Sequence, residues 1–145
     1  MRYAIDCEFI DTPSCSALIS LAIVREDGAS RYFEFDYPES ELTPWLRENV
    51  VPHLCGPRVA FKDAAESLAF FIDEDDGKPE IWGYFGAYDW YWLCRLFGGL
   101  MAMPDTFPHR YRELAEQKYR KPVAAGAQHN ALADARGIMQ AVLAL

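Results

Sequence analysis

Two long runs of apolar residues at the start of the chain predict buried strands. They cover residues 2–10 and 17–24 and are separated by a polar turn at residues 11–16. The step from Asp27 to Gly28 is typical of a hairpin. Residues 31–37 then alternate aromatic and charged side chains with a period of two, as in a strand with one side in water. The opening of the chain therefore predicts a three-stranded antiparallel meander.

The middle and the end of the chain show mainly helical patterns. Thr43 can cap a helix that begins at Pro44 and is stopped by Pro52. Apolar residues at three- and four-residue spacing predict a second helix over residues 59–72, and a short strand is expected over residues 80–84. Three further helices are expected, over residues 87–97, about 111–120 and 130–143. This order predicts an α/β fold, with a mixed sheet flanked by helices.

Length and composition favour a single domain, residues 1–145. An apolar content of 51% is sufficient to bury its core. The longest apolar stretch, residues 17–24, is far shorter than a transmembrane helix. Asp6 lies where a secretory signal peptide needs an uninterrupted apolar segment. A cytoplasmic protein without membrane contact is therefore expected.

The positions of the cysteines and the net charge exclude few functions. Four cysteines lie far apart, without zinc-site spacing, and are expected to be unpaired: Cys7, Cys15, Cys55 and Cys94. The net charge of −8 at first disfavours a nucleic-acid partner. Residues 107–122, however, carry a local charge of +3, which leaves −11 on the remainder. The charge count therefore neither excludes nor establishes such a partner.

Asp6 and Glu8 are two residues apart on the first predicted strand, so their side chains point to the same face. Two uncompensated carboxylates are costly on so apolar a strand unless a cation neutralises them. The alternative is a solvated pair at the end of the strand. Acidic pairs at this spacing also occur elsewhere in the chain, for example Glu39/Glu41 and Asp73/Asp75, which keeps that alternative open.

Three further residues with useful chemistry lie in the second half of the chain. Asp89 follows a glycine-containing turn and lies in the first turn of a predicted helix, where it could simply complement the helix dipole. His129 lies just outside the last helix if Asn130 is its N-cap, and Asp134 interrupts an Ala/Leu-rich face of that helix. The alternative here is a helix-start histidine and a solvated aspartate.

Together, four carboxylates on three segments and one histidine suit phosphodiester hydrolysis. Carboxylate oxygens are preferred ligands of Mg²⁺ and Mn²⁺. Two such ions can activate a water molecule and stabilise the leaving oxygen. Histidine is the side chain best able to take the proton of that water near neutral pH.

Three motifs carry a family resemblance. DCEF, GAYD and HNALAD occur in this order and resemble the motifs of the DEDDh 3′–5′ exonucleases, a group of the ribonuclease H-like superfamily. The similarity to one branch, the small polyadenylate-preferring exoribonuclease RNase AS, covers nearly the whole chain. It rests further on MRY-x₂-D-x-EFI, LIS, W-x-R-x₂-V-x-P, R-E-L and H-x-A-L-x-D-A-R.

The resemblance implies a five-stranded mixed sheet in ribonuclease H-like order, a homodimer, and hydrolysis of single-stranded RNA from the 3′ end to nucleoside 5′-monophosphates. The resemblance further implies a preference for RNA with adenylate at its 3′ end. The resemblance also implies that Asp6, Glu8 and Asp134 hold two divalent cations, Mg²⁺ or Mn²⁺. Asp89 would support the second cation directly or through water, and His129 would be the general base.

Single strands are held by aromatic stacking and a basic track. The expected substrate-binding residues are Phe9 and Ile10 beside the acidic pair, Tyr88 in the GAYD motif, and Arg110 and Arg112 in the basic segment. Burial in the core is the alternative for the aromatic residues, and solvation for the basic ones.

Three other functions stay open from the sequence. A DNA-directed or proofreading-type 3′–5′ exonuclease shares the fold and would lack dependence on the 2′-hydroxyl. A non-catalytic nucleic-acid-binding or protein-interaction domain should have lost part of the acidic set, which is complete here. A small-molecule phosphohydrolase should cleave nucleotides as readily as oligomers.

Overall fold

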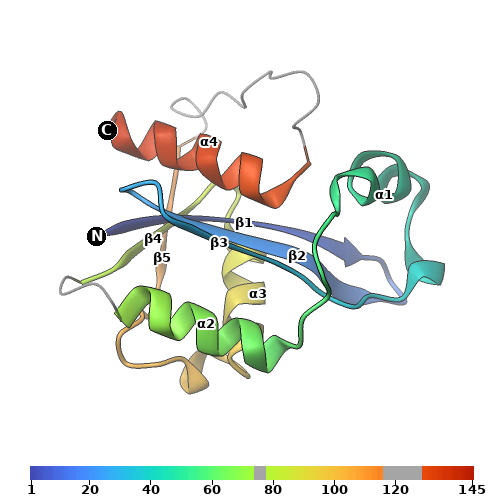
Figure 1. The fold of residues 1–145 in the computed structure, drawn as a ribbon, viewed down its shortest axis with the longest axis horizontal. Coiled ribbons are helices and arrows are strands. Elements are labelled where there is room, and N and C mark those ends of the chain that lie inside the picture. The colour runs from blue at the N-terminus through green and yellow to red at the C-terminus, as the bar shows by residue number, and fades with distance from the viewer. Residues whose placement is uncertain (74–77, 116–128) are drawn as a thin grey trace.

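One mixed sheet of five strands organises the computed structural model, which describes residues 1–73, 78–115 and 129–145 (Figure 1). The strands are β1 (Arg2–Asp11), β2 (Ser16–Arg25), β3 (Ser30–Glu34), β4 (Glu80–Gly83) and β5 (Tyr111–Glu113). Their order is β3-β2-β1-β4-β5, with β1 to β3 antiparallel and with β1, β4 and β5 parallel. The structure confirms the α/β class and the mixed five-stranded sheet with flanking helices.

The fifth strand corrects one prediction. Tyr111–Glu113 form β5 and not the first part of a helix over residues 111–120. Ile81 pairs with Tyr111 and Gly83 with Glu113 in a parallel register. Three residues are too few for a period-two pattern, and the strand depends on its pairing with β4, which local patterns do not contain. Residues 116–120 lie outside the described part of the chain.

The other helices occur with small shifts at their ends. They are α1 (Pro44–Asn49), α2 (Phe61–Asp73), α3 (Ala87–Leu96) and α4 (Ala131–Leu143), with short 3₁₀ turns at Glu39–Glu41, Val51–His53 and Leu100–Ala102. Both expected caps are formed, because Thr43 accepts the N–H of Leu46 at 3.2 Å and Asn130 that of Ala133 at 3.1 Å. No helix in the described ranges has the length and apolar character that crossing a bilayer requires.

Helices cover both faces of the sheet (Figure 1). Alternation along β1 directs Tyr3 and Ile5 into a cluster with α2 and α3, whereas Ala4 packs in a second cluster with α4. A third cluster lies beneath α1 and includes Ile10 and Leu46. Each large side chain buried in this way contributes about 1.5–3 kcal/mol of hydrophobic stabilisation. The two faces of β1 therefore belong to different layers.

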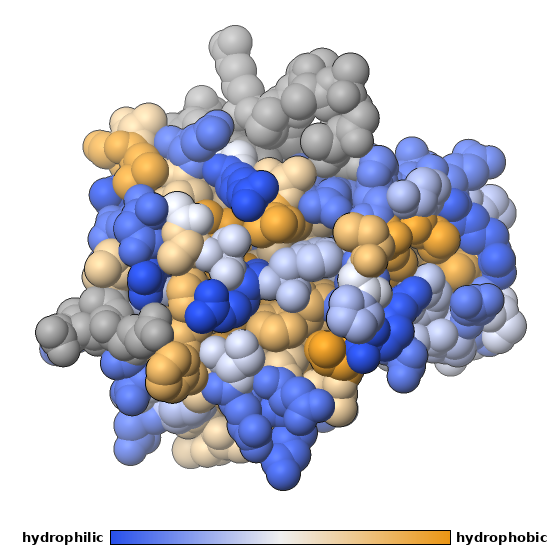
Figure 2. All heavy atoms as spheres, viewed as in Figure 1, coloured by the Kyte–Doolittle hydropathy of each residue, from blue (hydrophilic) through white to orange (hydrophobic). Residues whose placement is uncertain are grey.

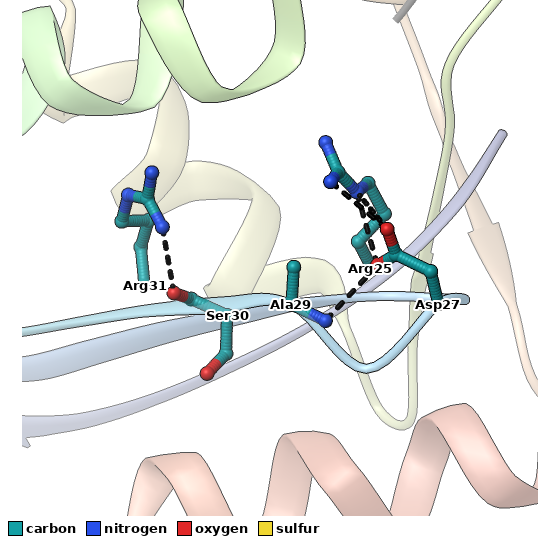
Figure 3. Close-up of polar contacts among 5 residues, drawn as sticks. All are labelled: Arg25, Asp27, Ala29, Ser30 and Arg31. Atoms are coloured by element: carbon teal, nitrogen blue, oxygen red, sulfur yellow. Dashed lines mark hydrogen bonds and ion pairs between the residues drawn. The ribbon is translucent and has the colours of Figure 1, made fainter. Parts of the chain in front are cut away.

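The turn between β2 and β3 is held by an arginine and an aspartate (Figure 3). The Nε of Arg25 donates to both carboxylate oxygens of Asp27, at 3.1 and 3.0 Å. Gly28 has a φ of 91°, which agrees with the hairpin predicted from the Asp-Gly step. The guanidinium groups of Arg25 and Arg31 lie 4.9 and 4.4 Å from the ring centroid of Phe71 on α2. The hairpin is thereby fastened to that helix.

The surface on the side of β3 is mixed in character. Figure 2 shows hydrophobic residues interspersed among hydrophilic ones on this face. Charged side chains along a strand at the edge of a sheet disfavour pairing with another chain. Arg31 on β3 is one such residue, and its guanidinium also covers the ring of Phe71.

Glu34 at the end of β3 connects the sheet with the segment before α2. Its side chain is 2% exposed, and Oε1 accepts the hydroxyl of Tyr32 at 2.8 Å and the N–H groups of Cys55 and Gly56 at 2.8 and 3.0 Å. Its carbonyl accepts the N–H of Val59 at 2.9 Å. Burial, together with the bond to Glu34, raises the pKa of Tyr32. The buried charge is tolerated because these donors satisfy it.

Glu34→Ala should lower the free energy of unfolding by about 2–4 kcal/mol, since it leaves a hydroxyl and two N–H groups without their acceptor. Urea denaturation followed by tryptophan fluorescence measures this change. The control is Glu66→Ala on the exposed side of α2, which removes an equal carboxylate and should cost less than about 0.5 kcal/mol. Equal losses in the two variants would contradict the role given to Glu34.

Candidate active site

Three carboxylates from opposite ends of the chain meet on one face of β1. One oxygen from each of Asp6, Glu8 and Asp134 lies within 4.8 Å of the other two. β1 presents the first two side chains on the same face, as its period of two predicted, and α4 carries the third. Small residues at the contact, Ala4 on β1 and Ala135 on α4, let the helix approach the sheet closely.

This group of oxygens is suited to a divalent cation. All the donors are carboxylate oxygens, which are the ligands that Mg²⁺ and Mn²⁺ prefer. Asp134 is 6% exposed, and Asp6 and Glu8 are half-buried. Their mutual repulsion is therefore poorly screened by water, and a cation bound between them would remove it. The residues present thus fit a metal centre.

Asp89 approaches the same group from the other face of the sheet. It lies in the first turn of α3, is 5% exposed, and its Oδ1 accepts the N–H of Cys7 at 2.9 Å. Burial, and to a smaller degree the charge of Glu8, raises the pKa of Asp89 to about 8. The elevated pKa shows that a further negative charge is unfavourable here unless a cation compensates it.

Close contact between two glycines brings α3 to this position. A Cβ on Gly83 would lie 2.8 Å from the Cα of Gly86, and a Cβ on Gly86 would lie 2.9 Å from the Cα of Gly83. Any larger residue at either position would therefore push the start of the helix away from β4. Phe85 between them has a φ of 50°, which is uncommon for a residue other than glycine.

The geometry of β1 leaves room for the contact with Asp89. β4 pairs with β1 at Arg2–Ala4, so in the described ranges the remainder of β1 has no strand partner on that side. The N–H of Cys7 lies beyond this pairing and donates to Asp89 instead. A side chain from α3 thereby takes the place of a strand partner next to Asp6 and Glu8 on β1.

His129 lies just before α4, close to Asp134. Its backbone N–H donates to Oδ2 of Asp134 at 3.1 Å, and its φ of 67° places it in the left-handed region. Its ring makes an edge contact with Trp45 of α1, with centroids 4.6 Å apart and planes at 78°. The ring contact places the imidazole of His129 against α1, and the backbone bond joins the residue to Asp134.

Two of the expected substrate-binding residues form an aromatic pair. Phe9 stacks on Tyr88 with ring centroids 5.1 Å apart and an interplanar angle of 19°, and Tyr88 is 52% exposed. Ile10 differs, because it is completely buried in the cluster beneath α1 and its side chain offers no surface to a ligand. A role for Phe9 and Tyr88 in binding substrate stays a prediction.

The two arginines of the basic segment are placed differently. Arg112 on β5 donates to Glu80 at 2.6 Å, and its guanidinium lies 5.6 Å from the ring centroid of Trp82. Arg110 is exposed just before β5. Neither contact leads to the acidic group, so their role in binding substrate also stays a prediction. The remaining cations expected in this segment lie outside the described residues.

Two residues beside the site received no role from the sequence. Glu113 on β5 accepts the N–H groups of Phe85 and Gly86, at 2.6 and 3.1 Å. The contact of Glu113 with the turn requires β5 to pair with β4. It could not be predicted from the sequence, because a helix was expected over residues 111–120. Trp45, on α1, contacts the ring of His129. The feature of the sequence that could have indicated a role for Trp45 is a large aromatic residue in a short, capped helix.

The cysteines behave as the sequence predicted. All four are unpaired, and Cys7 and Cys94 are buried. Burial, followed by the charges of Asp89, Asp6 and Glu8, raises the pKa of the Cys7 thiol well above its ordinary value. A buried thiol with a raised pKa is mostly protonated near neutral pH and is therefore a poor nucleophile.

Comparison with known proteins identifies the family of the chain. The whole chain, residues 1–145, matches the 3′-5′ exoribonuclease Rv2179c-like domain. It is 36% identical over 149 residues to the 3′-5′ exoribonuclease Rv2179c of Mycobacterium tuberculosis strain H37Rv, with 94% of this chain and 88% of the relative covered. The values are the same for the 3′-5′ exoribonuclease MT2234.1 of strain CDC 1551.

Among solved structures, the family B DNA polymerase from the hyperthermophilic archaeon Pyrobaculum calidifontis is similar to this chain with a TM-score of 0.41 and 18% identity. The similarity covers 72% of this chain and 12% of the polymerase. The family itself is shown by the match over the full length and by the identity to the mycobacterial proteins. The chain belongs to the family of Rv2179c-like 3′-5′ exoribonuclease domains.

Proposed function

We propose that this chain is a 3′–5′ exoribonuclease that hydrolyses single-stranded RNA from its 3′ end to nucleoside 5′-monophosphates, and that it acts as a homodimer. The observation that carries the proposal is the meeting of Asp6, Glu8 and Asp134 in one group, with Asp89 and His129 beside it. Membership of the exoribonuclease family supports the choice of RNA. The DEDDh assignment and the closeness to RNase AS belong to the same proposal and rest on the three motifs.

In this proposal Asp6, Glu8 and Asp134 hold two divalent cations, Mg²⁺ or Mn²⁺, and Asp89 supports the second. Such cations activate water and stabilise the charge that develops on the leaving oxygen. The task of the protein is to hold four mutually repelling carboxylates in place. It does so on β1, α3 and α4, which are regular elements and therefore position side chains more accurately than loops do.

His129 acts as the general base that takes a proton from the attacking water. The hydrogen bond from its backbone N–H to Asp134 fixes the backbone of His129, and the contact of its ring with Trp45 restricts where the imidazole can lie. In this proposal the attacking water would be bound beside Asp134, within reach of that imidazole. Restricting the base in this way reduces the entropy lost when it is brought to the reacting water.

The RNA strand would be bound by aromatic rings near Asp89. Phe9 and Tyr88 already form a stacked pair, and Tyr88 and Phe85 are 52% and 69% exposed. Tyr88 and Phe85 also line a mostly apolar cavity of about 410 Å³ with Tyr84, Ala87, Glu113, Leu114 and Ala115. Base stacking on exposed aromatic rings contributes about 1–3 kcal/mol per base and is tolerant of sequence. Arg110 and Arg112 are proposed to contact phosphates.

Asp6→Ala should reduce Mg²⁺-dependent degradation of end-labelled RNA by at least about a thousandfold, since several kcal/mol of metal-derived stabilisation are lost. Isothermal titration with Mn²⁺ should show weakened metal binding in the same variant. Asp73→Ala removes an exposed carboxylate at the end of α2 and should leave both measurements unchanged. Full activity in Asp6→Ala would contradict the proposed two-metal mechanism.

His129→Ala should slow hydrolysis by about 10²–10⁴-fold, which is the usual contribution of a general base. Its Mn²⁺ binding should stay within about twofold of that of the unaltered protein, because metal binding is assigned to the carboxylates. His109→Ala, at an exposed position before β5, is the matched control. Loss of metal binding in His129→Ala would place the imidazole among the ligands and contradict its role as base.

Substrate choice is tested with homopolymers of equal length. Oligo(A) RNA should be degraded at least about tenfold faster than oligo(U) or oligo(C), and faster than oligo(dA), with AMP as the product seen by chromatography. Faster degradation of oligo(dA) would favour a DNA-directed enzyme. Hydrolysis of free nucleotides at the same rate as oligomers would favour a small-molecule phosphohydrolase. Binding without any metal-dependent product would favour a non-catalytic domain.

A further inference from the structure

A carboxylate on β5 holds the start of the helix that carries Asp89. Oε1 of Glu113 accepts the N–H of Phe85 at 2.6 Å, and Oε2 accepts the N–H of Gly86 at 3.1 Å. Gly86 is the N-cap of α3 and Phe85 precedes it, so these two N–H groups belong to the turn that leads into the helix. The first N–H groups of a helix lack partners within the helix, so an acceptor must come from elsewhere. Glu113 supplies it from a neighbouring strand.

The position of Glu113 is itself set by the sheet. It pairs with Gly83 in the parallel register of β4 and β5, and the next residue, Leu114, donates its N–H to the carbonyl of Gly83 at 2.8 Å. The carboxylate is thus attached to the sheet on one side and to the turn Phe85–Gly86 on the other. Because Phe85 has a φ of 50°, the turn requires such an external support to stay in this conformation.

The start of α3 determines where Asp89 lies. Asp89 is three residues after Gly86, and the helical bond from the N–H of Trp90 to the carbonyl of Gly86, at 2.9 Å, joins the same turn. A displacement of Gly86 would therefore move the Asp89 carboxylate by a similar amount. That carboxylate meets Cys7 of β1 at 2.9 Å, within a group of charges that tolerates little error.

We infer that Glu113 is a positioning residue for the second divalent cation: it holds the first turn of α3 so that Asp89 reaches β1 and the neighbouring Glu8. This inference rests on the metal-supporting role proposed for Asp89. It assigns to Glu113 no contact with the reacting atoms. Its two oxygens are engaged by the backbone of the turn, so it acts on the metal centre through Asp89.

The central test compares E113Q with E80Q. Gln has one acceptor oxygen and one NH₂ group, so in E113Q one of the two backbone N–H groups loses its bond, while the shape of the side chain is kept. Glu80 lies on the adjacent strand β4, where its carboxylate is bonded to Arg112, and E80Q makes the same change of charge away from the turn. Mn²⁺ binding by isothermal titration and by electron paramagnetic resonance is the readout that does not depend on activity.

The unaltered protein and E80Q should bind two Mn²⁺ ions. E113Q should bind one of them about 10–100-fold more weakly, the range seen when a residue that supports a metal ligand is lost. Raising the Mg²⁺ concentration should restore most of the RNA hydrolysis by E113Q, because the ligands themselves are present. Two sites of unchanged affinity in folded E113Q would overturn the inference.

D89N separates this inference from the proposed function. If D89N keeps both Mn²⁺ sites, the metal-supporting role of Asp89 is wrong, and the role inferred for Glu113 is then wrong as well. If D89N loses one site and E113Q loses none, only the role of Glu113 is wrong. The double variant D89N/E113Q should bind Mn²⁺ as weakly as D89N and no more so, since Glu113 acts through Asp89. An additive loss would contradict that route.

E113D covers the case in which E113Q is too unstable to fold. It is one methylene shorter but keeps both carboxylate oxygens, so it should fold and bind the second Mn²⁺ ion with an affinity between those of the unaltered protein and D89N. Circular dichroism and the thermal midpoint establish that each variant is folded. Folded E113D with unchanged affinity for both ions, and with a start of α3 displaced in its structure, would also overturn the inference.

Discussion

The carboxylates of Asp6, Glu8, Asp89 and Asp134 repel one another, and the elements that carry them must keep them together against that repulsion. Burial adds a cost of desolvation to this repulsion, and burial together with the charge of Glu8 raises the pKa of Asp89 to about 8. Left to local preferences, such side chains would turn toward water. Their convergence therefore depends on the packing of α3 and α4 against β1, which supplies a far larger free energy than any single pair of charges.

β1 is the common support of the site, and its two faces are used differently. One face carries Asp6 and Glu8 toward α4, and small residues such as Ala4 and Ala135 allow that helix to lie close. From the other face, Asp89 reaches the edge of β1 where β4 no longer pairs with it. The close contact of Gly83 and Gly86 makes this possible. A short β4 is thus part of the architecture of the site.

Hydrogen-bonded side chains at the ends of elements complete this arrangement. Glu34 joins β3 to the segment before α2, and Glu113 joins β5 to the start of α3. Asn130 caps α4 and leaves His129 just outside the helix, where its N–H meets Asp134. In each case a polar side chain satisfies backbone donors that the regular element leaves unpaired. The contacts of Glu113 and Asn130 lie at the starts of the helices that carry Asp89 and Asp134, the residues assigned to metal binding.

The sequence by itself determined what depends on neighbours along the chain. The period of two placed Asp6 and Glu8 on one face, and the residues at Thr43 and Asn130 indicated where two helices begin. Only the tertiary structure decided what covers each face. Ile10 lies two residues beyond Glu8, yet α1 buries it, and β5 exists because β4 is beside it. The contacts of Glu113 with the start of α3 and of Trp45 with His129 join distant segments, and no local pattern of hydrophobic and polar residues encodes which segments will meet.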